Sequence, residues 1–137
     1  MAFSEKATQE LHIFTEAVKE IVNTSFSAFK KEDVELAGTV EPLEEVIDDL
    51  NMELKTRHIR RLREGKCTID LGFVHSDITT NYERIADHCS NIAVCLIQVK
   101  QEGFDTHEYL DILKEENSEE FRHEYMELSE KYALPES

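Results

Sequence analysis

The sequence has few residues that interrupt helices and few bases to balance its acids. Of 137 residues, only four are glycine and two are proline. So few breakers, with no Gly/Ser-rich tract, argue against an all-β protein with many turns and favour long helices. The chain carries 30 acidic and 15 basic side chains, a formal net charge of -15. This charge argues against binding to nucleic acid or adhesion to an anionic membrane surface by the chain as a whole, because both need net positive charge.

Cysteines and long apolar runs are also scarce. The three cysteines, Cys67, Cys89 and Cys95, show no C-x-x-C spacing, which is typical of reduced thiols in a cytoplasmic protein. The longest strongly apolar stretch, residues 92–97, is far shorter than the ~20 residues that span a bilayer. The first residues also lack the basic start and apolar core of a secretory signal. Since a hydrophobic fraction of 40% is too high for a disordered tail, we expect one cytoplasmic domain covering residues 1–137.

Apolar residues recur in steps of three and four, which predicts amphipathic helices. The three longest cover residues 3–29, 33–65 and 68–103. Asp33 and Thr68 are the predicted N-caps, and Gly65 suits the left-handed position after a helix end. Gly38 and Pro42 should kink the first turns of the second helix or move its start to Pro42. The short loop after it makes the second and third helices an antiparallel hairpin.

The predicted fold class is all-α, an elongated up-down helical bundle of three long helices plus a C-terminal helical segment. The acidic C-terminal extension, residues 104–134, is predicted to hold a short helix and a longer one. We expect the third helix to bury the stripe Leu71, Val74, Ile78, Ile85, Ile92, Leu96 and Val99. Core positions are also expected for Phe14, Phe26, Phe29, Cys89 and Cys95.

Two predicted helices carry an acid four residues from another acid: Glu44 with Asp48, and Glu83 with Asp87. Like charges at this spacing destabilise a helix by ~0.2–0.5 kcal/mol per pair, so these pairs call for a reason. In an antiparallel hairpin, residues equally far along the chain from the turn lie at one level. When the turn is centred between Gly65 and Lys66, Glu44 is level with Asp87. Asp48 is likewise level with Glu83. The four carboxylates can therefore face one another at one height.

A divalent cation bound among these acids would offset their repulsion. The all-oxygen ligand set favours magnesium, manganese, iron or calcium, in one or more sites, over a thiolate-type zinc site. Alternatively, the acids lie on solvated helix faces, which an excess of 15 acids over bases produces often. Glu45 and Asp49 have the same spacing, which weakens the argument from register. Spacing alone leaves both interpretations open.

The same residues resemble the signature of PhoU-like proteins. Residues 81–93, NYERIADHCSNIA, are similar to an E-R-I-x-D-H segment followed by N-I-A, and residues 44–54 resemble the second acidic motif of that family. The run from His58 through Gly65 and Cys67 to Phe73, followed by N-Y-E-R-I-A-D-H-C, resembles one branch most. That branch is the PhoU-like domain at the cytoplasmic C-terminus of sodium/phosphate cotransporter family proteins. The resemblance covers residues 36–99, the core motif region.

This resemblance implies a helical bundle whose motifs bind divalent metal, with magnesium, manganese or iron the leading candidates. The implied ligands are Glu44, Asp48, Glu83 and Asp87. It also implies a non-catalytic regulator of phosphate transport or phosphate signalling at the inner face of the plasma membrane. Its partner would be a phosphate transporter membrane domain, in the same polypeptide or a separate one. PhoU proper has two three-helix repeats and this chain offers one, so the metal cluster needs a homodimer or is absent. The chain is then an excised domain or a free-standing relative.

Basic residues concentrate between Lys55 and Lys66, where six bases accompany one acid. This segment carries +5, so the other residues carry -20. Its four arginines are candidates for contact with an anion, a lipid phosphate or an acidic partner: Arg57, Arg60, Arg61 and Arg63. Alternatively, bases near a helix C-terminus complement the helix dipole and pair with the surplus acids. Any membrane contact is expected to be indirect or through this basic hairpin tip.

Two neighbours of the acids are candidates for a supporting role, His88 beside Asp87 and Asn91 one turn further. Either could hydrogen-bond a ligating carboxylate, and His88 could itself be a ligand. The enzymatic alternative is a carboxylate-bridged di-iron bundle, which needs Glu-x-x-His on two helices. The only such motif here is Glu120 to His123, so we expect no enzyme. A metal-free acidic helical adaptor is the remaining alternative.

Overall fold

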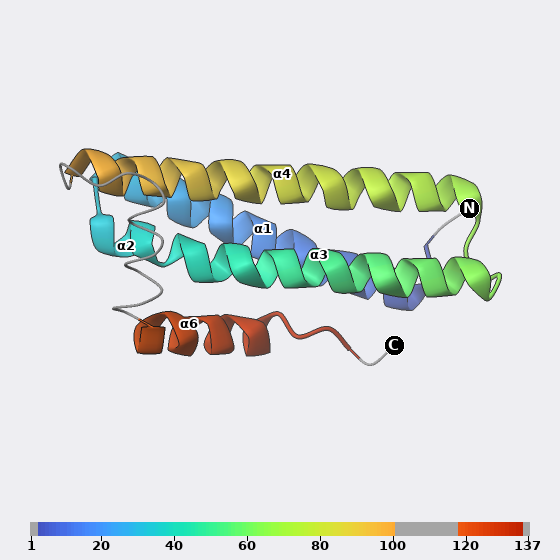
Figure 1. Ribbon diagram of the computed structural model, residues 1–137. Helices are drawn as coiled ribbons and strands as arrows, with labels where there is room; N and C mark the ends of the chain where they lie inside the picture. Colours follow the sequence, from blue (N-terminus) through green and yellow to red (C-terminus); the bar gives the residue numbers. More distant parts are fainter. Residues whose placement is uncertain (1–2, 101–117, 136–137) are drawn as a thin grey trace.

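The protein is a bundle of helices running up, down and up, seen here in a computed structural model that describes residues 3–100 and 118–135 (Figure 1). Within those residues the elements are α1 (Glu5–Lys31), α2 (Val34–Gly38), α3 (Val40–Arg63), α4 (Ile69–Lys100) and α6 (Ser118–Lys131). The helices α1, α3 and α4 pack against one another, and α6 packs along α3. The predicted all-α, elongated up-down bundle is confirmed.

Local sequence determines where α2 and α4 begin and where α3 ends. A side-chain oxygen of Asp33 accepts a hydrogen bond from the Leu36 amide at 3.1 Å, and the Thr68 hydroxyl accepts one from the Leu71 amide at 3.2 Å. Each cap satisfies an amide that has no partner within its helix. Gly65 follows the end of α3 with φ of +73°, a conformation that glycine adopts without strain. Both predicted caps and the predicted stop are confirmed.

The predicted second helix is two helices in the structure. α2 ends at Gly38, and the Thr39 hydroxyl donates to the Leu36 carbonyl at 2.7 Å where the chain turns. α3 then begins at Val40 and places Pro42 in its first turn, where a missing amide hydrogen is no loss. The break therefore falls just after Gly38, and α3 begins two residues before Pro42, which was the predicted alternative start.

The core lies where α1, α3 and α4 meet. The largest fully buried apolar side chains include Phe14 and Ile21 from α1, and Leu43, Ile47 and Leu54 from α3. Full burial of one such side chain contributes ~1.5–3 kcal/mol. α4 contributes mostly small residues to this core, such as Ala86, Cys89 and Ala93. Small side chains on α4 let the other two helices approach it closely.

The stripe predicted to be buried on α4 is therefore largely wrong. Ile85, Ile92 and Val99 are 38%, 44% and 74% exposed, although Leu96 is buried. The buried row lies about a quarter-turn away from these exposed residues and consists mainly of smaller or more polar side chains, with Leu96 and Ile97 near its C-terminal end. The sequence pattern favoured the largest apolar residues, whereas three closely packed helices select the smaller ones.

The aromatic core positions predicted on α1 are only partly correct. Phe14 is fully buried, with its ring edge-on to Tyr82 at 5.6 Å between centroids. Phe26 and Phe29, however, are 67% and 62% exposed, since they lie on the same side of α1 as exposed Val22. Of the two cysteines predicted in the core, Cys89 is buried and Cys95 is exposed.

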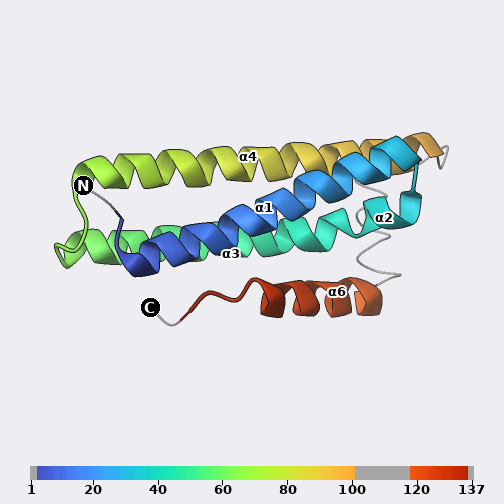
Figure 2. The ribbon, with the colours of Figure 1, turned by 180° about the vertical axis from the view of Figure 1, so that it is seen from behind.

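The C-terminal helix α6 covers the groove between α1 and α3. Tyr125 on α6 donates a hydrogen bond to Asp49 of α3, and Tyr132 just after α6 donates one to Glu20 of α1. The helix and its contacts lie on the side of α3 that faces away from α4 (Figures 1 and 2). The predicted longer C-terminal helix is confirmed. The predicted short helix before it, and the predicted end of the third helix near residue 103, lie outside the described residues.

None of the helices that the structure describes combines the length and the apolar character needed to cross a bilayer.

Candidate metal centre

The antiparallel packing of α3 and α4 aligns acids from both helices at one level. The carboxyl groups of Glu44 and Asp87 share a hydrogen bond. One turn earlier on α3, the Ser90 hydroxyl donates to Oε2 of Glu41 at 2.8 Å. In each pair the two residues are equally far along the chain from the hairpin turn. The register predicted from the position of Gly65 is confirmed.

The other two predicted acids lie in the same groove. The negative charges of Glu83 and Asp87 both act on the Asp48 carboxyl, and Asp48 in turn acts on Glu44. The structure therefore brings the four predicted acids into one groove between α3 and α4. Their role as metal ligands stays a prediction.

Repulsion and partial burial change how these acids titrate. Burial is the largest cause that raises the pKa of Glu44 to about 8, followed by the charges of Glu41 and Asp48 and the interaction with Asp87. At neutral pH the Glu44 carboxyl is therefore mostly protonated, as a hydrogen bond between two carboxyl groups requires. Burial, with the charges of Glu83 and Asp87, also raises the pKa of Asp48. The groove thus holds a proton at a pH at which isolated carboxyls have lost theirs.

The tightest group of acids differs from the predicted set. Carboxylate oxygens of Glu41, Glu44 and Glu45 lie within 4.8 Å of one another, and over the described residues this trio is the group that meets that spacing. Glu44 belongs to both sets, whereas Glu41, which is 9% exposed, was not predicted as a site residue. The groove is therefore a band of acids centred on Glu44 rather than four equivalent ligands.

Two further residues of α3 shape the groove and were missed in the sequence. Nδ2 of Asn51 donates to Oε2 of Glu83 at 2.8 Å, and Nζ of Lys55 lies 4.0 Å from the same oxygen. Asn51 is 4% exposed, and its Oδ1 has no hydrogen-bond partner. Their spacing could have identified them in the sequence. Glu44, Asp48, Asn51 and Lys55 recur in steps of four, three and four, which places them on one side of a helix.

The donor set fits a hard divalent cation. Carboxylate oxygens and a buried amide oxygen are the ligands that magnesium, calcium and manganese prefer, and ferrous iron also accepts carboxylates. The buried, unpartnered Oδ1 of Asn51 is the kind of atom that a bound cation or its water would satisfy. A cation here would be held by Glu44, Asp87, Asp48 and Glu83, with Asn51 beside them.

The two predicted supporting residues are less well placed. His88 and Asn91 are exposed on α4. The side chains whose contacts with groove acids the structure records are Ser90, Asn51 and Lys55 instead. The supporting role of His88 and Asn91 stays a prediction.

The basic cluster divides into an inner and an outer half. Arg57 and Arg61 turn inward to Glu10 of α1, with Nη1 of Arg57 and Nη2 of Arg61 each 2.7 Å from a carboxylate oxygen. Glu10 is fully buried, so the two guanidinium groups neutralise a charge that could not otherwise be buried. Arg57 and Arg61 therefore have an internal partner, and their contact with an external anion stays a prediction. Arg60 and Arg63 are exposed at the hairpin tip.

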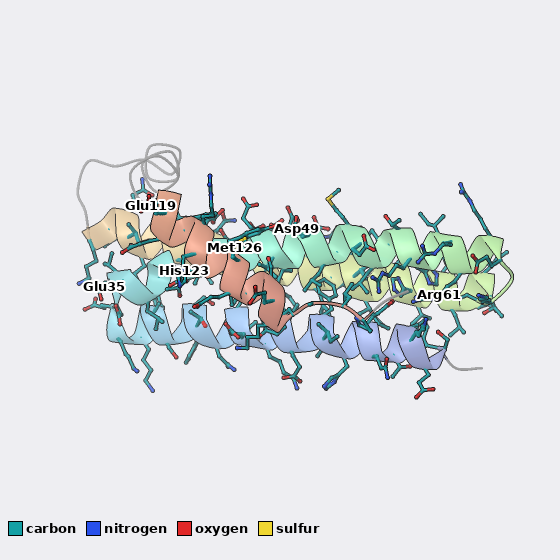
Figure 3. All side chains as sticks on the ribbon, turned by 90° about the horizontal axis from the view of Figure 1, so that it is seen from below. Glu35, Asp49, Arg61, Glu119, His123 and Met126 are labelled. Carbon is teal, nitrogen blue, oxygen red and sulfur yellow. The ribbon has the colours of Figure 1, made fainter. Side chains whose placement is uncertain are left out.

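A stacked histidine pair lies beside this buried ion group, whose Arg61 is labelled in Figure 3. The rings of His58 and His75 are 4.2 Å apart and 7° from parallel. Burial is the largest cause that lowers the pKa of both, to about 4 for His75, and the positive charge of Arg61 contributes at each ring. Both imidazoles are therefore neutral at pH 7. Sulfur of Cys67 lies 3.9 Å from Nε2 of His58, at the start of the loop into α4.

The Glu-x-x-His motif lies away from the acidic groove. Nε2 of His123 is 3.0 Å from Oε1 of Glu127 and its side chain is 74% exposed on α6 (Figure 3). α6 packs against α3 on the side near α1, whereas the acids lie on the side near α4. Glu120 and His123 therefore cannot join the groove acids in a di-iron centre without rearranging the bundle.

The fold and this groove define an all-α bundle with paired acidic motifs on a central hairpin. Residues 11–96 match the PhoU domain family, and the chain belongs to that family. Over 80 residues it is 31% identical to the phosphate-specific transport system accessory protein PhoU homolog 1 of Thermotoga maritima. That alignment covers 58% of this chain and 34% of the relative, so the chain spans about a third of the length of the curated relative it matches. No solved structure matches.

Proposed function

We propose that this chain is a non-catalytic, metal-binding regulatory domain that controls phosphate transport or phosphate signalling. The observation that carries the proposal is the acidic groove, in which burial and neighbouring acids raise the pKa of Glu44 to about 8 and Glu44 is hydrogen-bonded to Asp87 beside Asp48. Membership of the PhoU domain family and a relative whose name places it in a phosphate-specific transport system support the regulatory role.

A cation bound in the groove would link two helices of the bundle. Glu44 and Asp48 come from α3, while Glu83 and Asp87 come from α4, so a cation held by both pairs ties the two helices together. In its absence, the Glu44 proton replaces only part of that positive charge. Cation binding therefore stiffens the hairpin, and a partner that contacts the hairpin would sense the difference.

The partner we propose is the membrane domain of a sodium/phosphate cotransporter, within the same polypeptide or as a separate chain. The resemblance of residues 58–89 to the cytoplasmic domains of that transporter family supports this choice. Arg60, Arg63 and Lys66 are exposed at the hairpin tip and would contact acidic groups of the transporter or lipid phosphates beside it.

Metal analysis tests the groove directly. The wild-type chain, the Glu83→Ala, Asp87→Ala variant and a control with Asp70→Ala, Asp77→Ala are each equilibrated with magnesium, manganese or ferrous iron. Asp70 and Asp77 are exposed acids of the same helix, so the control loses the same charge outside the groove. Wild type and control should retain one metal that the groove variant loses.

Equal metal content in the wild type and the groove variant would contradict the metal site. The function that then remains is that of a metal-free acidic helical adaptor. The shared Glu44 proton favours that second candidate, because it lets the hairpin pack without a cation. Oxygen consumption by an iron-loaded sample would instead indicate a di-iron enzyme. For the regulatory role, deleting the domain from its parent transporter should change phosphate uptake by cells, and unchanged uptake would contradict it.

A further inference from the structure

The interior of the bundle near the hairpin turn holds two polar side-chain atoms that have no hydrogen-bond partner. They are Nη1 of Arg61 and Nε2 of His75, and the other such atom among the described residues is Oδ1 of Asn51 in the acidic groove. Arg61 is 9% exposed and His75 is 1% exposed, so bulk water does not solvate either atom. Because a buried polar atom without a partner is costly, above all on a charged group, this pair calls for a ligand.

Arg61 and His75 belong to one cluster of side chains. His58 lies one helical turn before Arg61 on α3, so their side chains are neighbours on one side of that helix. The rings of His58 and His75 stack 4.2 Å apart, which brings His75 of α4 to the same side of α3. Burial is the largest cause that lowers the pKa of His75, and the nearby His58 and Arg61 add to it. The two unpartnered atoms therefore lie in the same interior region.

Positive charge is in excess among the buried groups of this cluster. Arg61, labelled in Figure 3, donates from Nη2 to the carboxylate of Glu10, which also accepts a hydrogen bond from Nη1 of Arg57. Glu10 is fully buried, whereas Glu53, the second acid paired with Arg57, has a side chain that is 53% exposed. Two guanidinium groups thus share one buried carboxylate. A water molecule at Nη1 of Arg61 would satisfy the hydrogen bond but leave the charge unbalanced, whereas an anion does both.

His75 can supply a second donor to the same anion. Its imidazole is neutral at pH 7 because its pKa is lowered to about 4, and a neutral imidazole carries its proton on either nitrogen. With that proton on Nε2, His75 and Arg61 both donate to one acceptor. A metal cation is disfavoured at this position, since the charges of Arg61 and Lys55 already act on the ring and would repel it.

Close packing around the histidine rings limits the size of the ligand. A Cβ atom on Gly72 would lie 3.2 Å from Nε2 of His58 and 3.5 Å from Leu62, so α3 and α4 approach closely there. The ring of Phe3 lies edge-on to His75, with 6.2 Å between the centroids. Two donors in such a setting suit a small monovalent anion. A phosphate group, with a charge of about −1.5 to −2 and at least three acceptor oxygens, needs more donors than these two.

We propose that this cluster binds one small monovalent anion, of the size of chloride, between Nη1 of Arg61 and Nε2 of His75. The anion balances the second guanidinium charge and joins α3 to α4. Because Glu10 belongs to α1, the same group of charges connects the three long helices near the hairpin turn. This interior site is separate from the surface contact expected of Arg60 and Arg63, and it is independent of metal binding in the acidic groove.

Exchange of anions at constant ionic strength tests the site in solution. Urea unfolding of the wild type is followed in a chelator while chloride, or in a second series phosphate, replaces gluconate, which is too large for the cluster. Chloride should lower the unfolding equilibrium constant along a saturating curve, by about 11-fold at ten times its dissociation constant. Phosphate should give no saturating response.

Three variants assign the response to His75. His75→Phe keeps the ring but has no donor and should lose the chloride effect. His75→Gln, whose amide can donate in place of Nε2, should keep part of it. The control is His123→Phe, which removes a histidine whose side chain is 74% exposed on α6 and should respond like the wild type.

Bromide locates the anion in the wild type and does not depend on a variant that folds. Its anomalous scattering in crystals should give one peak in contact with both Nη1 of Arg61 and Nε2 of His75. Ordered water alone at that position overturns the proposal. So does a chloride response that fails to saturate or survives in His75→Phe, or a saturating response to phosphate in place of chloride.

Discussion

Glu44 on α3 and Asp87 on α4 share a hydrogen bond between two carboxyl groups, and that bond exists only while one of them holds a proton. The proton lies at a position where a divalent cation would satisfy more oxygens with more charge. We propose that the hairpin has two stable states, one with a proton and one with a cation, and that pH and metal concentration decide between them.

The first prediction concerns pH in the absence of metal. The folded-state pKa of Glu44 is about 8, above its ordinary value of 4.5, so the folded state binds more protons than the unfolded state between these values. The stabilisation is full below the ordinary value and is lost as the pH rises through about 8. The free energy of unfolding should fall by about 1–2 kcal/mol between pH 6.5 and 8.5, a figure reduced because Glu44 is only half-buried. Urea unfolding in a chelator measures it, and Glu44→Gln should flatten the slope. If Glu44→Gln shows the same slope as the wild type, general charge repulsion rather than Glu44 causes the fall in the free energy of unfolding.

A second prediction concerns acid. The pKa of His75 is lowered from 6.5 to about 4 by burial, so its folded state binds fewer protons than its unfolded state in that range. Its contribution to stability is therefore full above pH 6.5 and is lost as the pH falls through about 4. Thermal unfolding should show the midpoint falling over this window. His75→Phe, which keeps an aromatic ring against His58 but cannot be protonated, should fall less steeply. An unchanged slope would show that other groups dominate the acid response.

The third prediction concerns the buried ion group. Arg61→Leu leaves the fully buried Glu10 with Arg57 as its remaining recorded ion-pair partner, and breaking such a pair costs ~3–5 kcal/mol. Arg60→Leu, one position away and exposed, should change the free energy of unfolding by less than about 0.5 kcal/mol. Urea titrations of both variants give the comparison. A double variant, Glu10→Leu with Arg61→Leu, should recover much of the loss, and its failure to do so would mean that packing rather than charge sets the cost.

Much of the hairpin was predictable because its determinants are local. Gly65 ends one helix, Thr68 caps the next, and the loop between them fixes which residues of α3 and α4 are level. Once that level was known, the proximity of Glu44 and Asp87 followed from counting along the chain. Asn51 follows the same helical spacing as Glu44 and Asp48, but the prediction considered only the acids.

The remainder depends on contacts between distant parts of the chain. Nothing near Arg61 indicates that it pairs with Glu10, because that contact closes 51 residues of chain. The buried side of α4 was also unpredictable from periodicity, since Ala86 and Ala93 are buried while Ile85 and Ile92 are exposed. Periodicity finds where large apolar residues lie, and on α4 several of them face away from the core.

The central claim is that a cation replaces the shared proton in the acidic groove. Isothermal titration of the wild type with Mn²⁺ at pH 7, repeated in two buffers of different ionisation enthalpy, measures both binding and proton release. The claim predicts binding with about one proton released per cation, weaker binding without release in Glu44→Gln, and wild-type behaviour in Asp70→Asn, Asp77→Asn. Binding of Mn²⁺ to wild type and Glu44→Gln with equal affinity and no proton release would contradict it.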